Sequence, residues 1–404
     1  MSETTATRMA RGATLALAAL LWSAGAWLLL RTSVPPLPLS GLAEDRFFTA
    51  HELARMRSYS RGEDAIWLAA TLARLAVLGL SAWLLPSRIR RSRRGPLLTA
   101  GVTALVLAAA VWLAALPFVI ADLWWQHHWG LGPFGAGAWL ASQPEAVAPE
   151  AVAVVAGAVL VVALARRTKR WWLVAAPVVV AIAALYALAS GWIAVVGTQP
   201  LRSAALRADV ARLERIEHVT GTPVRVQDVS SQTRQVNAFT NGFGPSASVV
   251  LWNTLLDGRL SRRELDVLLG HELGHVRTRH VLKAIGWVAL IAAPALWLLA
   301  AALRRRGGAG EPANLPFLAL LLALVALAAA PAVNAVSRRY EAEADWRALN
   351  ATRDPAAASE LFQEFARTSL EDPDPGLLDY LWLENHPTLM QRIAMTRAWA
   401  ARRP

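Results

Sequence analysis

Cysteine is absent from the chain, and lysine occurs only at Lys169 and Lys283. The lack of cysteine excludes disulfide bonds and thiolate metal ligands, so any bound metal ion must be held by histidine, aspartate or glutamate. Charged residues make up only 17% of the 404 residues and hydrophobic residues 55%, which is outside the balance of a soluble domain. The composition therefore predicts an integral membrane protein, and the excess of arginine and alanine over lysine favours a bacterial source.

The formal net charge of the chain is +12. Such a basic balance is also typical of nucleic-acid-binding proteins, but here the arginines form short clusters between apolar runs, and no aromatic and basic recognition module accompanies them. Membrane topology explains the clusters more simply, because short cytoplasmic loops accumulate arginine and lysine. We therefore expect the lipid bilayer as a partner and no nucleic acid.

Seven apolar stretches have the length and composition of membrane-spanning helices. The fourth is short and consists of alanine and valine, and the acidic, proline-rich lead-in SQPEAVAPE indicates where it begins. The first stretch has an alternative interpretation as a cleaved signal peptide, because Arg8 and Arg11 precede it and small residues lie within it. The stretches are residues 13–30, 65–85, 97–121, 151–165, 171–197, 281–303 and 315–336.

Two segments are polar enough to lie in water, residues 198–280 and residues 337–404. With seven spans, both segments lie on the same side of the membrane, and a helical hairpin over residues 281–336 joins them. We expect the two segments to form one composite domain, while residues 1–197 form an N-terminal membrane region with five spans.

The first half of the composite domain carries both helical and strand patterns. SAALRADVARLERIEHVTG has apolar residues at helical spacing and ends at Gly221, a helix-terminating signal. TPVRVQDVSS, QVNAF and SVVLWNTLL have the pattern of short strands, with the turn NGFGPS between the last two. Ser261 and Glu264 then form a capping box that begins another helix. These patterns predict an α+β domain.

That second helix contains HELGH, residues 271–275. Residues four apart share a helix face, so the imidazoles of His271 and His275 can converge on one metal ion. Glu272 points beside that face, where it can act as a general base on a metal-activated water without binding the metal. The motif alone also arises by chance in hydrophobic helices, and HELAR at His51 begins identically but lacks the second histidine.

A catalytic zinc ion usually has three protein ligands, so a third histidine or carboxylate is expected. His280 lies five residues beyond His275, off the metal-binding face, and is interpreted as a surface or interfacial residue. The acidic cluster SRRYEAEADWRAL supplies better candidates, because Glu341 and Asp345 share a helix face from which Glu343 is turned away. One of the pair could bind zinc while the other orients a histidine ligand. The alternative is a solvated acidic face paired with nearby arginines.

Taken together, the motifs resemble those of the integral-membrane zinc metalloproteases of the M48 family. The resemblance is to the CAAX prenyl protease (Ste24-type) branch more than to the shorter HtpX-like branch. The family pattern of HExxH, SRxxExxAD and HPxxxxR occurs here in order, as HELGH at His271, SRRYEAEAD at Ser337 and HPTLMQR at His386. FFTAHELARMRSYSRGE and PFVIADLWWQHHWGLGPFGAGAWL also resemble Ste24-type segments that the HtpX-like branch lacks.

The resemblance implies a mainly α fold, with a seven-helix transmembrane bundle or barrel around a chamber. An α+β, gluzincin-like zinc metalloprotease domain would close one end, and one Zn²⁺ ion would bind per chain. His386 with Pro387 has an alternative interpretation as a helix-capping pair. The implied residues are His271, His275 and Glu341 as zinc ligands, Glu272 as general base, Asp345 as the residue that orients a ligand, His386 and Arg392 as groups that bind the scissile carbonyl or its oxyanion, and Asn237 and Ala238 as backbone partners of an extended substrate.

These features predict a zinc-dependent endopeptidase that acts on peptides or proteins, including lipid-modified or membrane-associated ones. The alternatives are an HtpX-like quality-control protease of membrane proteins and a non-proteolytic membrane protein with a structural metal site. The chain lacks the basic dilysine tail of the Ste24-type proteins, and a bacterial source argues against a prenylated substrate.

The side of the membrane on which the composite domain lies stays open. The clusters SRIRRSRR, RRTKR and RRR fall on the side of the N-terminus, whereas residues 122–149, on the other side, contain no arginine or lysine. This asymmetry favours a cytoplasmic N-terminus and an external composite domain. However, the Ste24-type resemblance implies the reverse, and residues 31–64 carry several arginines on the supposed outer side.

Overall fold

The computed structural model describes residues 3–402, with the side chains of all but residues 3–11, 15 and 145. Arg8 and Arg11, which suggested a signal peptide, therefore lie outside the described side chains. Within the described residues, seven helices are long and apolar enough to cross a membrane, as predicted, which indicates a multi-pass membrane protein. They are α1 (Glu3–Leu30), α2 (Ala50–Arg90), α3 (Pro96–His128), α4 (Ala136–Arg167), α5 (Trp171–Ala194), α8 (His280–Leu303) and α9 (Leu315–Thr352).

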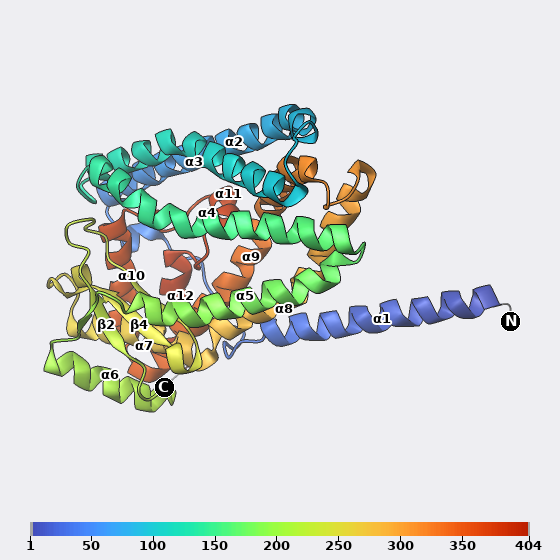
Figure 1. The fold of residues 1–404 in the computed structure, drawn as a ribbon. Coiled ribbons are helices and arrows are strands. Elements are labelled where there is room, and N and C mark those ends of the chain that lie inside the picture. The colour runs from blue at the N-terminus through green and yellow to red at the C-terminus, as the bar shows by residue number, and fades with distance from the viewer. Residues whose placement is uncertain (1–2, 403–404) are drawn as a thin grey trace.

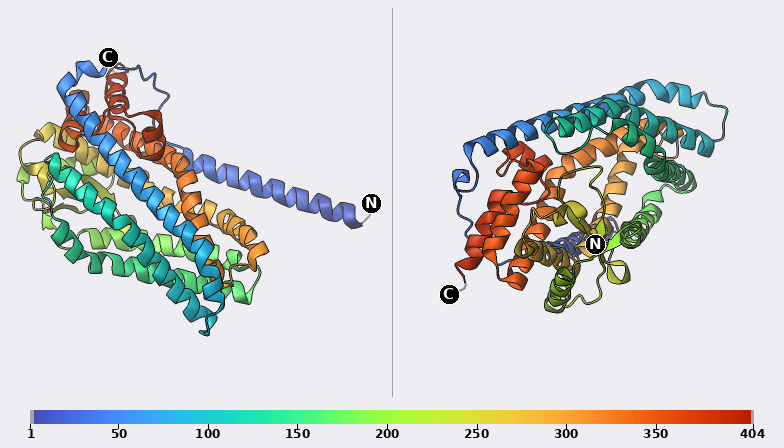
Figure 2. Two further views of the ribbon diagram at one scale, coloured as in Figure 1. Left: turned by 90° about the horizontal axis from the view of Figure 1, so that it is seen from above. Right: turned by 90° about the vertical axis from the view of Figure 1, so that its left-hand side faces the viewer.

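Helices α2, α3, α4, α5, α8 and α9 each contact the next, and α9 contacts α2, so they form a closed ring. Figure 2 shows this ring end-on, whereas α1 projects away from the others (Figure 1). Only the C-terminal part of α1 lies beside another helix, and there Trp22 donates a hydrogen bond to the carbonyl oxygen of Leu290 in α8 at 3.2 Å. Helices α2, α3, α4 and α9 line a mostly apolar cavity of about 1010 Å³. The predicted bundle of membrane helices is thus observed, with a cavity lined by four of them, but α1 lies at its periphery rather than in the ring.

The helices extend beyond the apolar stretches, and the fourth begins well before its predicted start. The lead-in SQPEAVAPE was expected to precede the span, but α4 begins at Ala136 and continues through Pro144 and Pro149. A proline removes one backbone hydrogen bond and bends a helix, but packing against neighbouring helices allows the helix to continue. Prolines inside α2, α3, α5, α8 and α9 behave in the same way.

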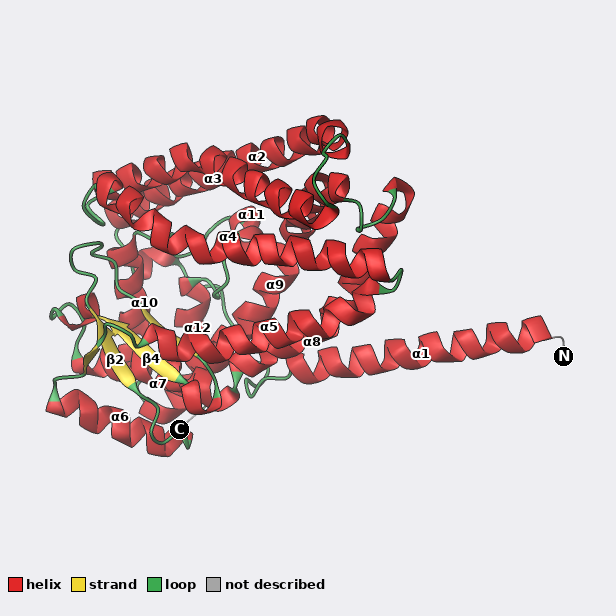
Figure 3. Ribbon diagram, viewed as in Figure 1, coloured by secondary structure: helices red, strands yellow, loops and turns green. Residues whose placement is uncertain are grey.

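The composite domain lies at one end of the bundle and contains all the strands in the described part of the chain (Figure 3). Its four-stranded sheet has the order β1-β2-β4-β3, in which β2 and β4 are parallel and the other neighbours antiparallel. Strand β3 is therefore an edge strand, and it pairs with β4 through Ala238 opposite Leu251. The strands are β1 (Gln199–Pro200), β2 (Val224–Gln227), β3 (Ala238–Asn241) and β4 (Ser248–Trp252).

Helices cover this sheet and form one hydrophobic core with it, which includes Leu213, Leu251, Leu269, Leu361 and Ile393. The first of these helices ends at Glu217 rather than at the predicted Gly221, because His218 already adopts the left-handed conformation (φ 54°) that closes a helix. These helices are α6 (Ala204–Glu217), α7 (Arg262–Thr278), α10 (Pro355–Ser369) and α12 (Leu389–Ala400). The short helix α11 (Leu377–Trp382) packs against α9 and contributes no residue to this core. The short 3₁₀ turns are η1 (Glu44–Arg46), η2 (Gly244–Ser246), η3 (Asn253–Leu256), η4 (Arg304–Arg306) and η5 (Pro312–Asn314).

Helix α9 connects the membrane region to the composite domain without a break. Its first half is apolar, and its second half, which carries SRRYEAEAD, packs against α7. Helix α7 begins with the predicted capping box, in which Ser261 accepts a hydrogen bond from Glu264 N and Glu264 accepts one from Ser261 N. The hairpin of α8 and α9 therefore leaves the composite domain next to HELGH and returns beside it.

Candidate metal centre and active site

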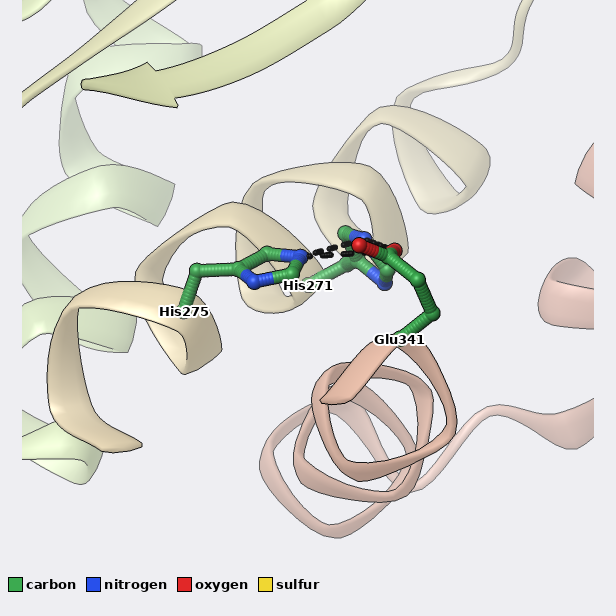
Figure 4. Close-up of side chains that lie close together, drawn as sticks. All are labelled: His271, His275 and Glu341. Atoms are coloured by element: carbon green, nitrogen blue, oxygen red, sulfur yellow. Dashed lines mark hydrogen bonds and ion pairs between the residues drawn. The ribbon is translucent and has the colours of Figure 1, made fainter. Parts of the chain in front are cut away.

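The structure brings the three predicted metal ligands together at the contact between α7 and α9. Figure 4 shows the imidazoles of His271 and His275 on one face of α7, with the carboxylate of Glu341 reaching them from α9. The two Nε2 atoms are 3.0 Å apart, and Glu341 Oε2 lies 3.3 Å from His271 Nε2 and 3.5 Å from His275 Nε2. Among the described residues, these three form the one His/Asp/Glu cluster compact enough to hold a metal ion.

The distances fit a tetrahedral ion. Bonds of about 2.0–2.1 Å to nitrogen and oxygen place ligand atoms roughly 3.3 Å from one another. Glu341 Oε2 is buried, and no described residue gives it a hydrogen bond of ordinary geometry, although imidazole nitrogens surround it. An orphaned carboxylate oxygen between imidazole nitrogens is costly unless a cation completes the site. The donor set therefore fits a bound metal ion.

Two glycines allow α7 and α9 to approach closely enough for these ligands to meet. A Cβ atom at Gly274, the fourth residue of HELGH, would lie 3.1 Å from Cβ of Arg347 and 3.4 Å from the carbonyl oxygen of Ala344. A Cβ at Gly270 would lie 3.3 Å from Cα of Ala348. A Cβ atom at either position would be tighter than an ordinary contact and would require its neighbour on α9 to shift, so the glycines permit the close spacing between HELGH and Glu341.

Asp345 orients the imidazole of His271 through Nδ1, the ring nitrogen that faces away from the other metal ligands. Its Oδ1 lies 2.8 Å from His271 Nδ1, and Arg392 donates to the same carboxylate through Nε (2.8 Å) and Nη2 (2.7 Å). All three side chains are buried. The contact holds the proton on Nδ1, so that Nε2 presents its lone pair to a metal. Although burial lowers the pKa of His271, the carboxylates of Asp345 and Glu341 outweigh this effect and raise the pKa to about 10. The two carboxylates therefore favour a positive charge at this position, whether that of a proton or of a metal ion.

Glu272 is buried beside the metal ligands without being one of them. The hydroxyl of Thr240, on β3, lies 2.8 Å from Glu272 Oε2 and 3.0 Å from the Glu272 backbone oxygen, and its single proton serves one of them at a time. Thr240 was not predicted from the sequence, where the only signal was its place in a strand close to Asn237. It fixes the position of the predicted general base.

A cavity of about 160 Å³ adjoins these groups. Its lining contains His271 and Glu272, and also His386, Arg392, Asn237 and Ala238, all of which were predicted as site residues. The sequence did not single out Glu371, which lines the same cavity and forms no hydrogen bond with another described residue. Burial raises the pKa of Glu371, while the positive charges of His386 and Arg392 lower it.

His386 stands at the mouth of this cavity, with its side chain 46% exposed and its Nε2 atom 3.2 Å from Glu341 Oε2. Desolvation lowers the pKa of His386, but the nearby carboxylate of Glu341 raises it by more, so the net direction is upward. The alternative interpretation of His386 and Pro387 as a capping pair is wrong. Thr388 caps α12 instead, through a hydrogen bond from Gln391 N.

The interpretation of His280 as a surface or interfacial residue is also wrong. Its side chain is only 7% exposed, and its Nδ1 atom lies 2.8 Å from His275 Nδ1. The helical spacing used in the prediction fails because α7 ends at Thr278 and Arg279 adopts a left-handed conformation (φ 55°). The chain changes direction there, so His280 begins α8 behind the metal ligands.

The family profile named Peptidase family M48 matches residues 200–400. A protease HtpX homolog of Acidiphilium cryptum (strain JF-5) is 30% identical over 231 residues, which cover 52% of this chain and 79% of that protein. The chain belongs to peptidase family M48. The uncharacterized metalloprotease YhfN of Bacillus subtilis (strain 168) is 29% identical over 204 residues, or 48% of each chain, so this match spans about half the length of that relative.

The likeness in fold extends over nearly the whole M48 chain. The crystal structure of S. mikatae Ste24p matches with a TM-score of 0.68 and 16% identity, over 94% of this chain and 96% of that chain. The predicted family and the predicted Ste24-like fold are therefore confirmed. At this identity the likeness concerns the fold alone.

Proposed function

We propose that this M48 chain is a zinc-dependent endopeptidase of a bacterial cell membrane, with one Zn²⁺ ion per chain. The observation that carries the proposal is the meeting of His271, His275 and Glu341 beside a buried carboxylate, Glu272, that is not part of the ligand cluster. A structural zinc site is closed by four protein ligands, whereas three ligands leave one position open for chemistry. This ligand count argues against a purely structural metal site.

A bound zinc ion would supply the positive charge that acidifies a water molecule and polarises the scissile carbonyl. Glu272 accepts a proton from the attacking water, whose oxygen bonds to the carbonyl carbon. Glu272 then delivers that proton to the amide nitrogen as the C–N bond breaks, which gives a carboxylic acid and an amine. The remaining proton of the consumed water passes from the acid to the amine, so a carboxylate and an ammonium group are released. The hydrogen bond from Thr240 keeps Glu272 in position for both transfers.

His386 and Arg392 are proposed to bind the scissile carbonyl as negative charge develops on its oxygen. Both line the cavity next to Glu272. Arg392 uses Nε and Nη2 to hold Asp345, and its Nη1 forms no hydrogen bond with another described residue, so it can donate to substrate. Fixed donors of this kind act without reorganisation in a water-poor site, which makes them effective in stabilising an oxyanion.

The substrate is proposed to bind as an added strand on β3. This strand is at the sheet edge, and Asn237 and Ala238, at its start, line the catalytic cavity. Backbone pairing holds an extended peptide with little dependence on its sequence. The apolar cavity between the membrane helices supports peptide or protein substrates that are membrane-associated or lipid-modified.

The proposal divides the chain into four functional parts. Residues 1–197 form the membrane region, residues 281–336 form the transmembrane hairpin, and residues 198–280 and 337–404 form the two halves of the protease domain. The arginine clusters lie away from the protease domain, which supports an orientation with that domain outside the cell.

The variant Glu272→Gln tests the proposed function. It keeps the size and polarity of the side chain but cannot accept the proton, so we expect it to retain zinc and fold while losing peptide cleavage. Glu341→Gln is the matched variant for the metal site and should lose zinc as well as activity. Normal turnover by Glu272→Gln would refute the mechanism, and trapping substrates on this variant for mass spectrometry would identify what the protease cleaves.

A further inference from the structure

A buried row of polar groups lies behind His275, on the side away from Glu341. His275 Nδ1 lies 2.8 Å from His280 Nδ1, and His280 Nε2 lies 3.1 Å from Glu343 Oε2. The side chains of His280 and Glu343 are only 7% and 5% exposed. Neither residue takes part in the proposed mechanism, yet burying a histidine and a carboxylate has a cost that packing alone does not require.

The protons of this row can be arranged in only one way when His275 binds a metal through Nε2. Its Nδ1 must then carry the proton, because a neutral imidazole has one donor nitrogen and one acceptor nitrogen. That proton is donated to His280 Nδ1, which leaves the His280 proton on Nε2, where it is donated to Glu343. Every donor therefore has an acceptor, and the negative charge of Glu343 favours this arrangement.

Two further elements hold Glu343 in place. Lys283, one turn after His280 in α8, donates to Glu343 Oε2 at 3.0 Å and to the carbonyl oxygen of Arg31 at 3.1 Å. The backbone N–H of Ser33 donates to Glu343 Oε1. The segment that follows α1 therefore closes the row from the outside.

Tyr340 fixes the ring of His280. The two rings are stacked, with centroids 4.6 Å apart and an angle of 12° between their planes. The Tyr340 hydroxyl donates to the carbonyl oxygen of Leu29 at 2.8 Å and accepts from Trp287 Nε1 at 2.9 Å. His280 is thus held by a ring face, by a carboxylate and by His275, which leaves its imidazole little freedom to rotate.

We propose that His280 is a positioning residue for the metal ligand His275, and that Glu343, Lys283 and residues 29–33 hold it in place. The two histidines of HELGH are then supported in different ways, His271 directly by a carboxylate and His275 through a second imidazole. Such partners orient a ligand ring and raise its basicity, and their loss typically weakens metal binding by about 10- to 100-fold. The inference rests on the proposed zinc site.

Two substitutions separate positioning from space filling. His280→Phe retains the ring and its stacking on Tyr340 but removes both nitrogens. His280→Asn places an amide near the position of Nδ1 and can restore the contact with His275. His51→Phe, at the exposed histidine of HELAR, is the matched control.

Zinc affinity is measured by competition with a chelator on full-length protein carrying Glu272→Gln, so that no readout depends on turnover. The absorption spectrum of bound Co²⁺ and the Tm of the metal-free protein are recorded alongside. We expect His280→Phe to bind zinc about 10- to 100-fold more weakly, with an altered Co²⁺ spectrum. His280→Asn should recover part of the affinity, and His51→Phe should match the parent.

An unchanged zinc affinity and Co²⁺ spectrum in folded His280→Phe would overturn the inference. If that variant does not fold, Glu343→Ala, which removes the acceptor for His280 Nε2, is judged by the same two measurements, and parental values would overturn the inference. Failure of the parent protein itself to bind zinc would refute the proposed function instead, so the two failures are distinguishable.

Discussion

Gly274 of α7 lies so close to α9 that a Cβ atom in its place would be 3.1 Å from Cβ of Arg347. HELGH and Glu341 belong to these two helices, so the distance between the helices also sets the distance between the metal ligands. The glycine inside HELGH thus has a role that neither metal binding nor proton transfer explains, and it can be tested separately from both.

Gly274→Val should separate α7 from α9 and impair the metal site without changing any ligand. Overpacking of this kind costs about 1–3 kcal/mol of stability. We expect a lower Tm and weaker zinc binding, the latter because Glu341 can no longer reach both imidazoles. Gly79→Val in α2, where a Cβ would meet no atom within 4 Å, is the control and should bind zinc normally. Equal zinc affinity in the two variants would show that the close approach is not required.

Thr240→Val should slow catalysis and leave the metal site intact. The substitution preserves the shape of the side chain and removes the hydroxyl that donates to Glu272. A hydrogen bond to a charged group contributes about 1.5–3 kcal/mol, so we expect kcat to fall by roughly tenfold or more with little change in KM. Zinc content should equal that of the wild type. Thr240→Ser, which keeps the hydroxyl, should retain most of the activity, and equal kcat in all three proteins would argue against this role.

Glu371 should influence which peptides are cleaved. It lines the catalytic cavity, and no described residue forms a hydrogen bond with its carboxylate. A basic substrate side chain in reach of Glu371 would gain a charge-assisted hydrogen bond. We therefore expect Glu371→Gln to lower kcat/KM for peptides with lysine near the scissile bond relative to glutamine peptides, by about tenfold.

The pH dependence of this preference follows from the direction of the shift. Burial raises the pKa of Glu371, and only the ionised carboxylate attracts a basic residue, so the preference should be lost as pH falls through this raised pKa. Glu360→Gln, at an exposed position of α10, is the control and should leave the preference unchanged.

Asp354 should stabilise the composite domain in a pH-dependent way. It caps α10 through a hydrogen bond from Ala357 N at 3.0 Å and pairs with Arg263 of α7. The hydrogen bond from Arg263 lowers the pKa of Asp354 below its value in the unfolded chain, which is about 3.9. A carboxyl group whose pKa is lower in the folded protein than in the unfolded chain stabilises the fold at pH values above its unfolded pKa. This stabilisation is lost as pH falls through the pKa of the folded protein.

The corresponding measurement compares the Tm of Asp354→Ala with the wild type across pH. Loss of the cap should cost about 1 kcal/mol at pH 7. The difference should shrink as pH falls below about 4, where Asp354 of the wild type begins to lose its charge. Asp374→Ala, at an exposed acidic residue, is the control, and a Tm difference that is constant with pH would contradict the ionic contribution.

The features that could be predicted from the sequence are those that depend on residues close together along one helix. The spacing of His271 and His275 and the capping box at Ser261 are of this kind, and both are present in the structure. The acidic pair Glu341 and Asp345 was accessible because the apolar hairpin returns the chain to the side of HELGH, and the M48 resemblance then implied Glu341 as the ligand. In contrast, the left-handed conformation that ends α7 occurs at Arg279 rather than at a glycine. No sequence feature therefore marks the change of direction that buries His280.

Groups that approach the site from distant elements were missed for a different reason. Thr240 comes from a strand and Glu371 follows α10, and neither has a spacing relation to HELGH. The packing of the composite domain alone brings them to Glu272 and the cavity. Similarly, the two prolines in α4 read locally as a boundary, and only the surrounding helices explain why the helix continues through them.

The orientation of the protease domain can be determined with a reporter fused to the C-terminus. Arginine-rich residues 87–94, 166–170 and 304–306 lie at the end of the bundle away from the protease domain (Figure 1), and Arg166 donates to the carbonyl oxygen of Gly310 at 3.5 Å. Short loops rich in arginine stay in the cytoplasm. A reporter that is active only outside the cytoplasm should therefore be active at the C-terminus and inactive when inserted within residues 87–94. The opposite pair of signals would place catalysis on the cytosolic face, as the Ste24-type resemblance implies, and would mean that the arginines of residues 31–64 outweigh the three clusters.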